Sequence, residues 1–257
     1  MKICLDAGHG KFQNRSPALP EYYEGNRMFL LQNFLKQALE HYGIEVVCTR
    51  GQVEEDPSLY SRGMAAKGCD LFLSLHSNAV GSTANDTVDR VCVIHPVDGR
   101  GKALSQTLAE VITDVMGTSQ QPKVYVRWNS SHNADYYGVI RYSGQAGVTG
   151  LILEHSFHTH SRSAHWLMDD NNLRALAGAE AACIAEYYGL EAPEMRYELL
   201  KDVTSPFYRP TLEKLLTQDI LRGKGGTGED TVIDLGEDAL RILALLDRAG
   251  LFDPKKN

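Results

Sequence analysis

Few features of the sequence belong to a secreted or membrane-bound chain. Five cysteines occur among its 257 residues, and none forms a C-x-x-C pair: Cys4, Cys48, Cys69, Cys92 and Cys183. An odd and scattered set predicts reduced thiols rather than a disulfide framework or a zinc–thiolate site. No stretch approaches the roughly 18 consecutive apolar residues of a membrane span, so we expect no membrane insertion. A signal peptide is also missing, because Asp6 ends the first apolar run, and we expect synthesis in the cytoplasm.

Positive charge is scarce as well. Lysine and arginine number 26 against 33 acidic residues, so the formal net charge is -7. Nucleic-acid binding normally shows as a basic excess or patch, and we therefore expect no nucleic-acid partner. With 43% hydrophobic and 23% charged residues, the composition is that of a globular protein with a sizeable core.

Apolar runs alternate with helical patterns over the first 190 residues. Buried strands are expected in KICLDA, IEVVCTR, CDLFLSLHSNA, RVCVIHP and TGLILEHSF, and amphipathic helices over residues 27–42, 59–67, 101–116 and 173–188. This alternation predicts an α/β fold, with a mainly parallel twisted sheet and helices on both faces. The pattern changes after about residue 190, where prolines become frequent.

We therefore divide the chain into three parts. Residues 1–190 form the main domain, residues 191–210 a linker, and residues 211–257 a small, mostly helical C-terminal domain. The last part is expected to contain two short amphipathic helices around the Gly-rich segment GKGGTG. A piece this small has little core of its own, which favours self-association or support from a neighbour.

Three residues able to do chemistry directly follow, or end, three of the expected strands. His9 lies in DAGHG, His76 in SLHSNA and Glu154 in LILEHSF. Sites in open α/β sheets lie at the carboxyl ends of the strands, so these side chains are expected to converge. Taken singly, His9 is equally explained by a tight turn, and His76 by a buried histidine satisfied by hydrogen bonds.

Two of these residues suggest a metal site. Catalytic zinc usually takes three protein ligands and keeps one position open. His9 and His76 would supply two, and Glu21 or Glu24, just before the first long helix, a third. Glutamates at that place are also common because they favour the helix dipole. Asp6 is a candidate to orient the His9 imidazole.

Glu154 ends a buried strand, where desolvation disfavours the charged carboxylate. We therefore predict a raised pKa for Glu154, which suits a general base that takes a proton from water. The alternative is a carboxylate paired with an arginine such as Arg50 or Arg141.

The segment HSFHTH holds a competing cluster, His155, His158 and His160. On an extended chain His158 and His160 would point the same way, as zinc ligands can. We favour this cluster less, because the segment is expected to be a loop and has no H-E-x-x-H helix.

In order, these motifs resemble the zinc-dependent N-acetylmuramoyl-L-alanine amidases of the Amidase_3 type. The resemblance covers about residues 1–190 and rests on LDAGHG, a glutamate opening the first helix, VVCTR before LYSRGMAAK, SLHSNA and LILEHSF. It implies that His9, Glu24 and His76 ligate Zn²⁺ and that Glu154 is the catalytic glutamate. Glu24 is chosen over Glu21 by the family's distance from this glutamate to the T-R strand end.

The chain also departs from the family pattern. Ser156 stands where glycine is usual, His160 where asparagine is usual, and the loop RWNSSHNADYYGV is unlike the common one. We therefore assign no substrate-binding residues.

The resemblance implies hydrolysis of the amide between N-acetylmuramic acid and L-alanine in peptidoglycan, by zinc-activated water. The alternatives are another zinc peptidase or carboxypeptidase on the same fold, and a non-catalytic cell-wall-binding protein. A phage or prophage endolysin that reaches the wall after release, through a holin, would reconcile this substrate with the missing signal peptide. The C-terminal domain would then bind the wall or form a homo-oligomer.

Overall fold

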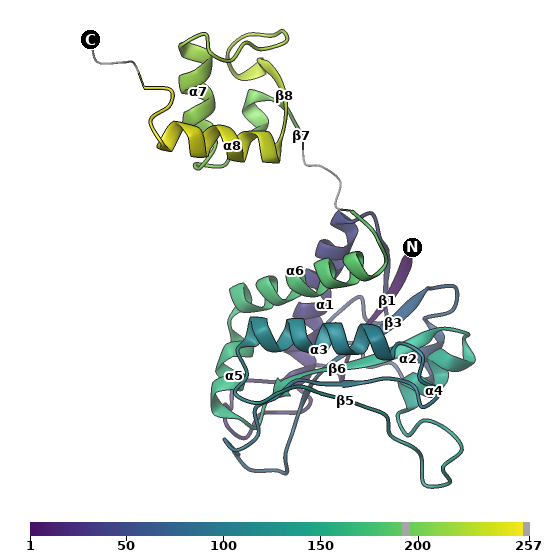
Figure 1. Cartoon of the computed structure of the whole chain (residues 1–257). Coiled ribbons are helices and arrows are strands. Elements are labelled where there is room, and N and C mark those ends of the chain that lie inside the picture. Colours follow the sequence, from purple (N-terminus) through teal and green to yellow (C-terminus); the bar gives the residue numbers. More distant parts are fainter. Residues whose placement is uncertain (192–195, 254–257) are drawn as a thin grey trace. The chain divides into compact units, whose positions relative to one another are not determined.

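The computed structural model describes residues 1–191 and 196–253 and contains two compact units, Met1–Ala192 and Pro193–Asn257. The first unit is an α/β domain, and the second is a small unit of helices and a two-stranded sheet (Figure 1). Within the described residues, no helix combines the length and the apolar character needed to cross a membrane.

The first unit is built on a six-stranded sheet in the order β2-β1-β3-β6-β4-β5. Its first four strands run parallel, whereas β4 is antiparallel to β6 and parallel to β5. This confirms the mainly parallel sheet expected from the sequence. The elements are β1 (Lys2–Ala7), α1 (Glu24–His41), β2 (Glu45–Cys48), α2 (Leu59–Met64), β3 (Leu71–Asn78), β4 (Cys92–Ile94), α3 (Lys102–Met116), β5 (Lys123–Tyr125), α4 (Gly138–Gln145), β6 (Thr149–Phe157), α5 (Ser161–Met168) and α6 (Asp170–Tyr187).

The sheet separates two layers of helices. Alternate residues of a strand face opposite sides, so Leu73 and Leu75 of β3 join the large core beneath α1, α3 and α6. Phe72, directly before Leu73, faces the other side and belongs to a second core with residues of α4, on the side covered by α2 and α4 (Figure 1). We call this second side the site face, because it also carries His76 and Glu154.

The helix α1 shows how the sequence sets these layers. Its buried Met28, Leu31, Leu35 and Leu39 recur at spacings of three and four residues and form one apolar stripe. Gly43 follows in a left-handed conformation, which ends the helix and lets the chain turn into β2.

The second unit has its own core of Leu200, Val203, Leu212, Ile233 and Leu240. Its elements are β7 (Arg196–Leu199), η1 (Leu200–Asp202), α7 (Arg209–Thr217), η2 (Gly228–Asp230), β8 (Val232–Gly236) and α8 (Glu237–Arg248). The helices α7 and α8 flank GKGGTG, as the amphipathic patterns predict.

The range 191–210, expected to be a linker, contains β7, which pairs with β8 in an antiparallel sheet. The sequence pattern missed this strand because its partner lies more than 30 residues away. Residues 192–195 of that range, and residues 254–257 of the C-terminal domain, lie outside the described residues. A role of the second unit in wall binding or self-association stays a prediction.

Candidate metal centre and catalytic site

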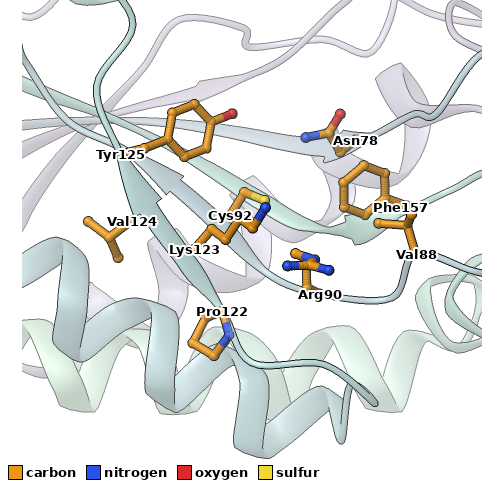
Figure 2. A pocket seen from close by; sticks show the side chains of 9 residues that line it. All are labelled: Asn78, Val88, Arg90, Cys92, Pro122, Lys123, Val124, Tyr125 and Phe157. Carbon is orange, nitrogen blue, oxygen red and sulfur yellow. The ribbon is translucent and has the colours of Figure 1, made fainter.

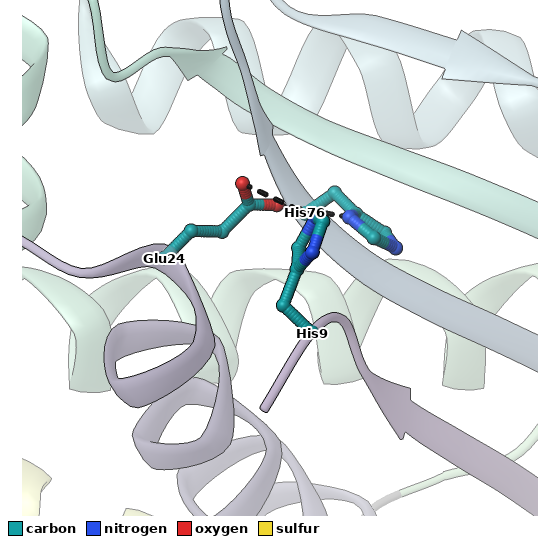
Figure 3. Close-up of side chains that lie close together, drawn as sticks. All are labelled: His9, Glu24 and His76. Atoms are coloured by element: carbon teal, nitrogen blue, oxygen red, sulfur yellow. Dashed lines mark hydrogen bonds and ion pairs between the residues drawn. The ribbon is translucent and has the colours of Figure 1, made fainter. Parts of the chain in front are cut away.

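Three of the side chains singled out in the sequence meet at the carboxyl ends of β1 and β3. One ligand atom from each of His9, Glu24 and His76 lies within 4.8 Å of the others (Figure 3). His76 Nδ1 is 2.9 Å from Glu24 Oε1, and His9 Nε2 is 3.5 Å from Glu24 Oε2. Two imidazoles and one carboxylate are a donor set that catalytic zinc sites use. Glu21, the other candidate, is exposed in the turn before α1.

Gly8 permits this close approach. A Cβ atom at Gly8 would lie 2.2 Å from His76 Cε1, so any side chain there would displace the imidazole. The next residue, His9, has φ = 60°, a left-handed conformation that non-glycine residues seldom adopt. The sharp turn after β1 thus directs the His9 ring toward His76, and the two ring centroids are 5.1 Å apart.

Glu24 is the first residue of α1 and is fully buried. Its Oε1 accepts a hydrogen bond from Ser77 N at 3.0 Å, and its Oε2 accepts one from Asn14 Nδ2 at 2.6 Å. Burial alone would raise the pKa of Glu24, but His76 and the other nearby histidines outweigh it and lower the pKa to about 2. Glu24 is therefore an ionised carboxylate at neutral pH, as a metal ligand must be.

His76 carries the complementary shift. Burial alone would lower its pKa, but the hydrogen bond and charge of Glu24 outweigh burial and raise the pKa to about 9. A cation bound by this cluster would replace the proton that His76 holds, so metal binding here releases a proton.

Glu154 lies on β6 directly beside this cluster, since its Cα pairs in register with that of His76. Burial raises the pKa of Glu154 to about 7, which confirms the predicted direction. Its Oε2 is buried and has no hydrogen-bond partner among the described residues. Neither proposed arginine pairs with it: Arg50 donates to Gly25 O at 2.9 Å, and Arg141 to Asp135 O at 2.8 Å.

His9, His76 and Glu154 open into one cavity of about 520 Å³ on the site face. Its walls come from the segment before α2, from α2 itself and from the start of α4, with Pro57, Leu59, Arg62, Tyr137 and Val139 among the lining residues. A cavity of this size holds a small segment of a polymer beside the two histidines and the carboxylate.

The expectation that Asp6 orients His9 is wrong. The Asp6 carboxylate is buried and accepts hydrogen bonds from Thr49 Oγ1 at 2.6 Å, Arg62 Nη1 at 2.8 Å and Ser74 Oγ at 2.6 Å. A buried carboxylate needs such partners, and three donors from neighbouring elements reach it where the His9 ring does not.

The sequence left Arg62 and Asn14 without a role, although both hold the cluster in place. Arg62 is nearly fully buried and donates to His9 O at 3.0 Å and to Ala7 O at 2.6 Å, so it fixes the turn after β1. Asn14 Nδ2 lies 3.2 Å from His9 Nε2 and also donates to Glu24. Arg62 stands in the quoted LYSRGM segment, whereas nothing in the sequence distinguishes Asn14.

The competing histidine cluster is dispersed. His155 lies on the opposite side of β6 from Glu154, with its Nε2 2.6 Å from Glu180 Oε1. His158 Nδ1 is 2.9 Å from Ser77 O, and His160 caps α5. Within residues 1–191 and 196–253, His9, Glu24 and His76 form the one group of three or more close metal-ligating side chains.

Comparison with known protein families assigns the first unit to one of them. Residues 3–186 match the Amidase_3 family, whose description is N-acetylmuramoyl-L-alanine amidase. No curated protein sequence matches the chain significantly.

Several solved amidases share the fold. The catalytic domain of CwlV, an N-acetylmuramoyl-L-alanine amidase from Bacillus (Paenibacillus) polymyxa var. colistinus, has a TM-score of 0.62 and 18% identity, over 74% of this chain and 99% of that chain. The CwlD amidase from Clostridioides difficile, solved with the GerS lipoprotein, has a TM-score of 0.63 and 19% identity, over 73% and 98%. The amidase AmiC2 of Nostoc punctiforme has a TM-score of 0.61 and 17% identity, over 74% and 97%.

Proposed function

The chain belongs to the N-acetylmuramoyl-L-alanine amidase family, and from this premise we propose that it cleaves the amide between N-acetylmuramic acid and L-alanine as a zinc enzyme. His9, Glu24 and His76 hold the Zn²⁺, and Glu154 is the catalytic base. The observation that carries the proposal is the meeting of these three ligand atoms within 4.8 Å beside a buried carboxylate whose second oxygen has no partner among the described residues.

The donor set fits zinc. Two neutral imidazoles and one carboxylate match the affinity of zinc for nitrogen and oxygen ligands, and the buried Glu24 supplies the negative charge that a dication needs. When bound, the zinc supplies Lewis-acid chemistry, which lowers the pKa of water and polarises the substrate carbonyl.

Glu154 moves the proton in this proposal. Its carboxylate takes a proton from the attacking water and then passes it to the amine of L-alanine as the amide bond breaks. Burial raises the pKa of Glu154 to about 7 in the metal-free protein. A carboxyl group with a raised pKa can both take up and give up a proton near neutral pH, as the two transfers require. The surrounding residues act by positioning: Arg62 fixes the His9 turn, and Asn14 holds Glu24 and His9.

A zinc carboxypeptidase could use the same donor set, so the test must identify which bond is cut. Purified peptidoglycan is digested with the enzyme, and the soluble and insoluble products are analysed. We expect new L-alanine amino groups, released stem peptides and uncut glycan strands. Release of a C-terminal amino acid with the muramoyl amide intact would instead establish the peptidase, and binding without any product would establish a wall-binding protein.

A further inference from the structure

A second cavity lies on the site face beyond the catalytic residues. It measures about 750 Å³ and is lined mainly by residues of β4 and β5 and the loops before them (Figure 2). The helices α2 and α4 pack against each other, with α4 also against β6, and leave this end of the face open. Figure 2 shows Tyr125, Cys92 and Lys123 on neighbouring strands, with Arg90 beside them.

Strand register connects this cavity to the catalytic site. His76 pairs with Glu154, Glu154 pairs with Cys92, and Cys92 pairs with Lys123. Paired residues of neighbouring strands face the same side of a sheet, so these four side chains form one row across β3, β6, β4 and β5. With strands spaced about 4.8 Å apart, the backbone of Lys123 lies about 10 Å from that of Glu154.

The far end of this row is positively charged. Arg90 and Lys123 line the cavity, and no acidic residue does. Among the described residues, neither cation is paired with a carboxylate. Arg90 Nε donates to Gln120 Oε1 at 3.0 Å, and this bond holds the guanidinium in place. In a protein of net charge -7, two such cations that line one groove favour an anionic ligand there.

The thiol between them is consistent with this arrangement. Burial and the Glu154 charge raise the pKa of Cys92 to about 11, whereas Arg90 and Lys123 act in the opposite direction. Cys92 pairs in register with Glu154 on one side and with Lys123 on the other, so its small side chain stands between them in the row.

We infer that the groove lined by Arg90, Cys92, Lys123 and Tyr125 is a subsite for the stem peptide, in which Arg90 and Lys123 bind a carboxylate of that peptide. The inference rests on the proposed function, because it takes the scissile amide to lie at Glu154. A peptide spans about 3.3–3.6 Å per residue, so two to three residues cover the distance from Glu154 to Lys123. In a stem peptide of the L-alanyl-γ-D-glutamyl-diaminopimelate type, the second and third residues carry free carboxylates, and a charge-assisted bond to arginine or lysine recognises them.

Binding of the product peptide tests the subsite without any catalytic step. The probe is the tripeptide L-alanyl-γ-D-glutamyl-meso-diaminopimelate, titrated into the zinc-loaded full chain by calorimetry. We expect the Arg90→Gln/Lys123→Gln double variant to bind it on the order of tenfold more weakly than wild type. Lys67→Gln, which removes an exposed lysine outside the groove, and Lys123→Arg, which keeps the charge, should bind as wild type does.

Amidated peptides identify the carboxylate. A peptide amidated at the contacted group, on either the second or the third residue, should bind wild type and the double variant equally weakly. The inference is overturned if wild type does not bind the tripeptide, or if the double variant binds it as wild type does. It is also overturned if the double variant weakens binding equally for a peptide whose carboxylates are all amidated. If the protein binds the tripeptide through Arg90 and Lys123 but does not cut the muramoyl amide, the proposed function is refuted and the subsite remains.

Discussion

The Cα atoms of His76 and Glu154 are register partners on β3 and β6, so a candidate metal ligand and the candidate base stand side by side on one face of the sheet. Parallel pairing at the carboxyl ends of central strands explains why two residues 78 positions apart share one cavity. The predictions below depend on this placement.

Replacement of Gly8 by alanine should weaken zinc binding. The new Cβ would lie 2.2 Å from the His76 ring, so the ring must shift from its place beside Glu24 and His9. We expect a loss of zinc affinity of at least about tenfold, measured by competition with a chelator. Gly178→Ala is the matched control, because a Cβ there meets nothing within 4 Å and the site stays intact. Equal zinc affinity in the two variants would show that the contact is unimportant.

Zinc binding should depend on His9 but not on the HSFHTH cluster. His9→Ala and His76→Ala each remove one of three ligands, so they should lose zinc on dialysis against metal-free buffer. His158→Ala should keep it, because His158 Nδ1 is engaged with Ser77 O and lies 3.7 Å from the nearest Glu24 oxygen. The zinc content of each variant is measured by mass spectrometry. Zinc retained by His9→Ala but lost by His158→Ala would place the metal site at the HSFHTH cluster instead.

The amidase rate should fall in acid as Glu154 becomes protonated. The base works as a carboxylate, so kcat/KM is lost as pH falls through the pKa of Glu154. That pKa is raised to about 7 in the metal-free protein, and a bound dication would lower it. We therefore expect an acid limb between about pH 4.5, the ordinary value, and about pH 7. Zinc content is measured at each pH, and a flat profile with zinc bound would contradict the role.

The buried pair of His155 and Glu180 should matter for stability. His155 Nε2 and Glu180 Oε1 are 2.6 Å apart and both side chains are fully buried, on the side of the sheet away from the cavity. Glu180→Ala leaves a histidine buried without its partner, and we expect the free energy of unfolding to fall by about 3 kcal/mol or more. The control is Glu186→Ala, an exposed position on the same helix. Equal urea midpoints for the two variants would refute the prediction.

The sequence predicts well whatever depends on local pattern. Long apolar runs identify the central strands, and their ends identify His9, His76 and Glu154 as neighbours. The short strand Lys123–Tyr125 was not predicted, because three residues carry too little periodicity to distinguish a strand from a loop.

Side-chain partnership was predicted less well. Asp6 was expected beside His9, yet its partners come from three other segments, including Arg62 more than 50 residues away. Tertiary packing determines which donors can reach a buried carboxylate, and the local sequence does not show this. The positive end of the row at Lys123 was equally hidden, because it depends on the order in which β4 and β5 join the sheet.

Glu154→Gln tests the central claim most directly, since it keeps the size of the side chain and removes the base. Zinc content and release of L-alanine amino groups from peptidoglycan are measured together for the variant and for wild type. The proposal predicts one equivalent of zinc in both proteins and a loss of turnover on the order of a thousandfold in the variant. A variant that keeps its zinc and still cuts the muramoyl amide at the wild-type rate would contradict it.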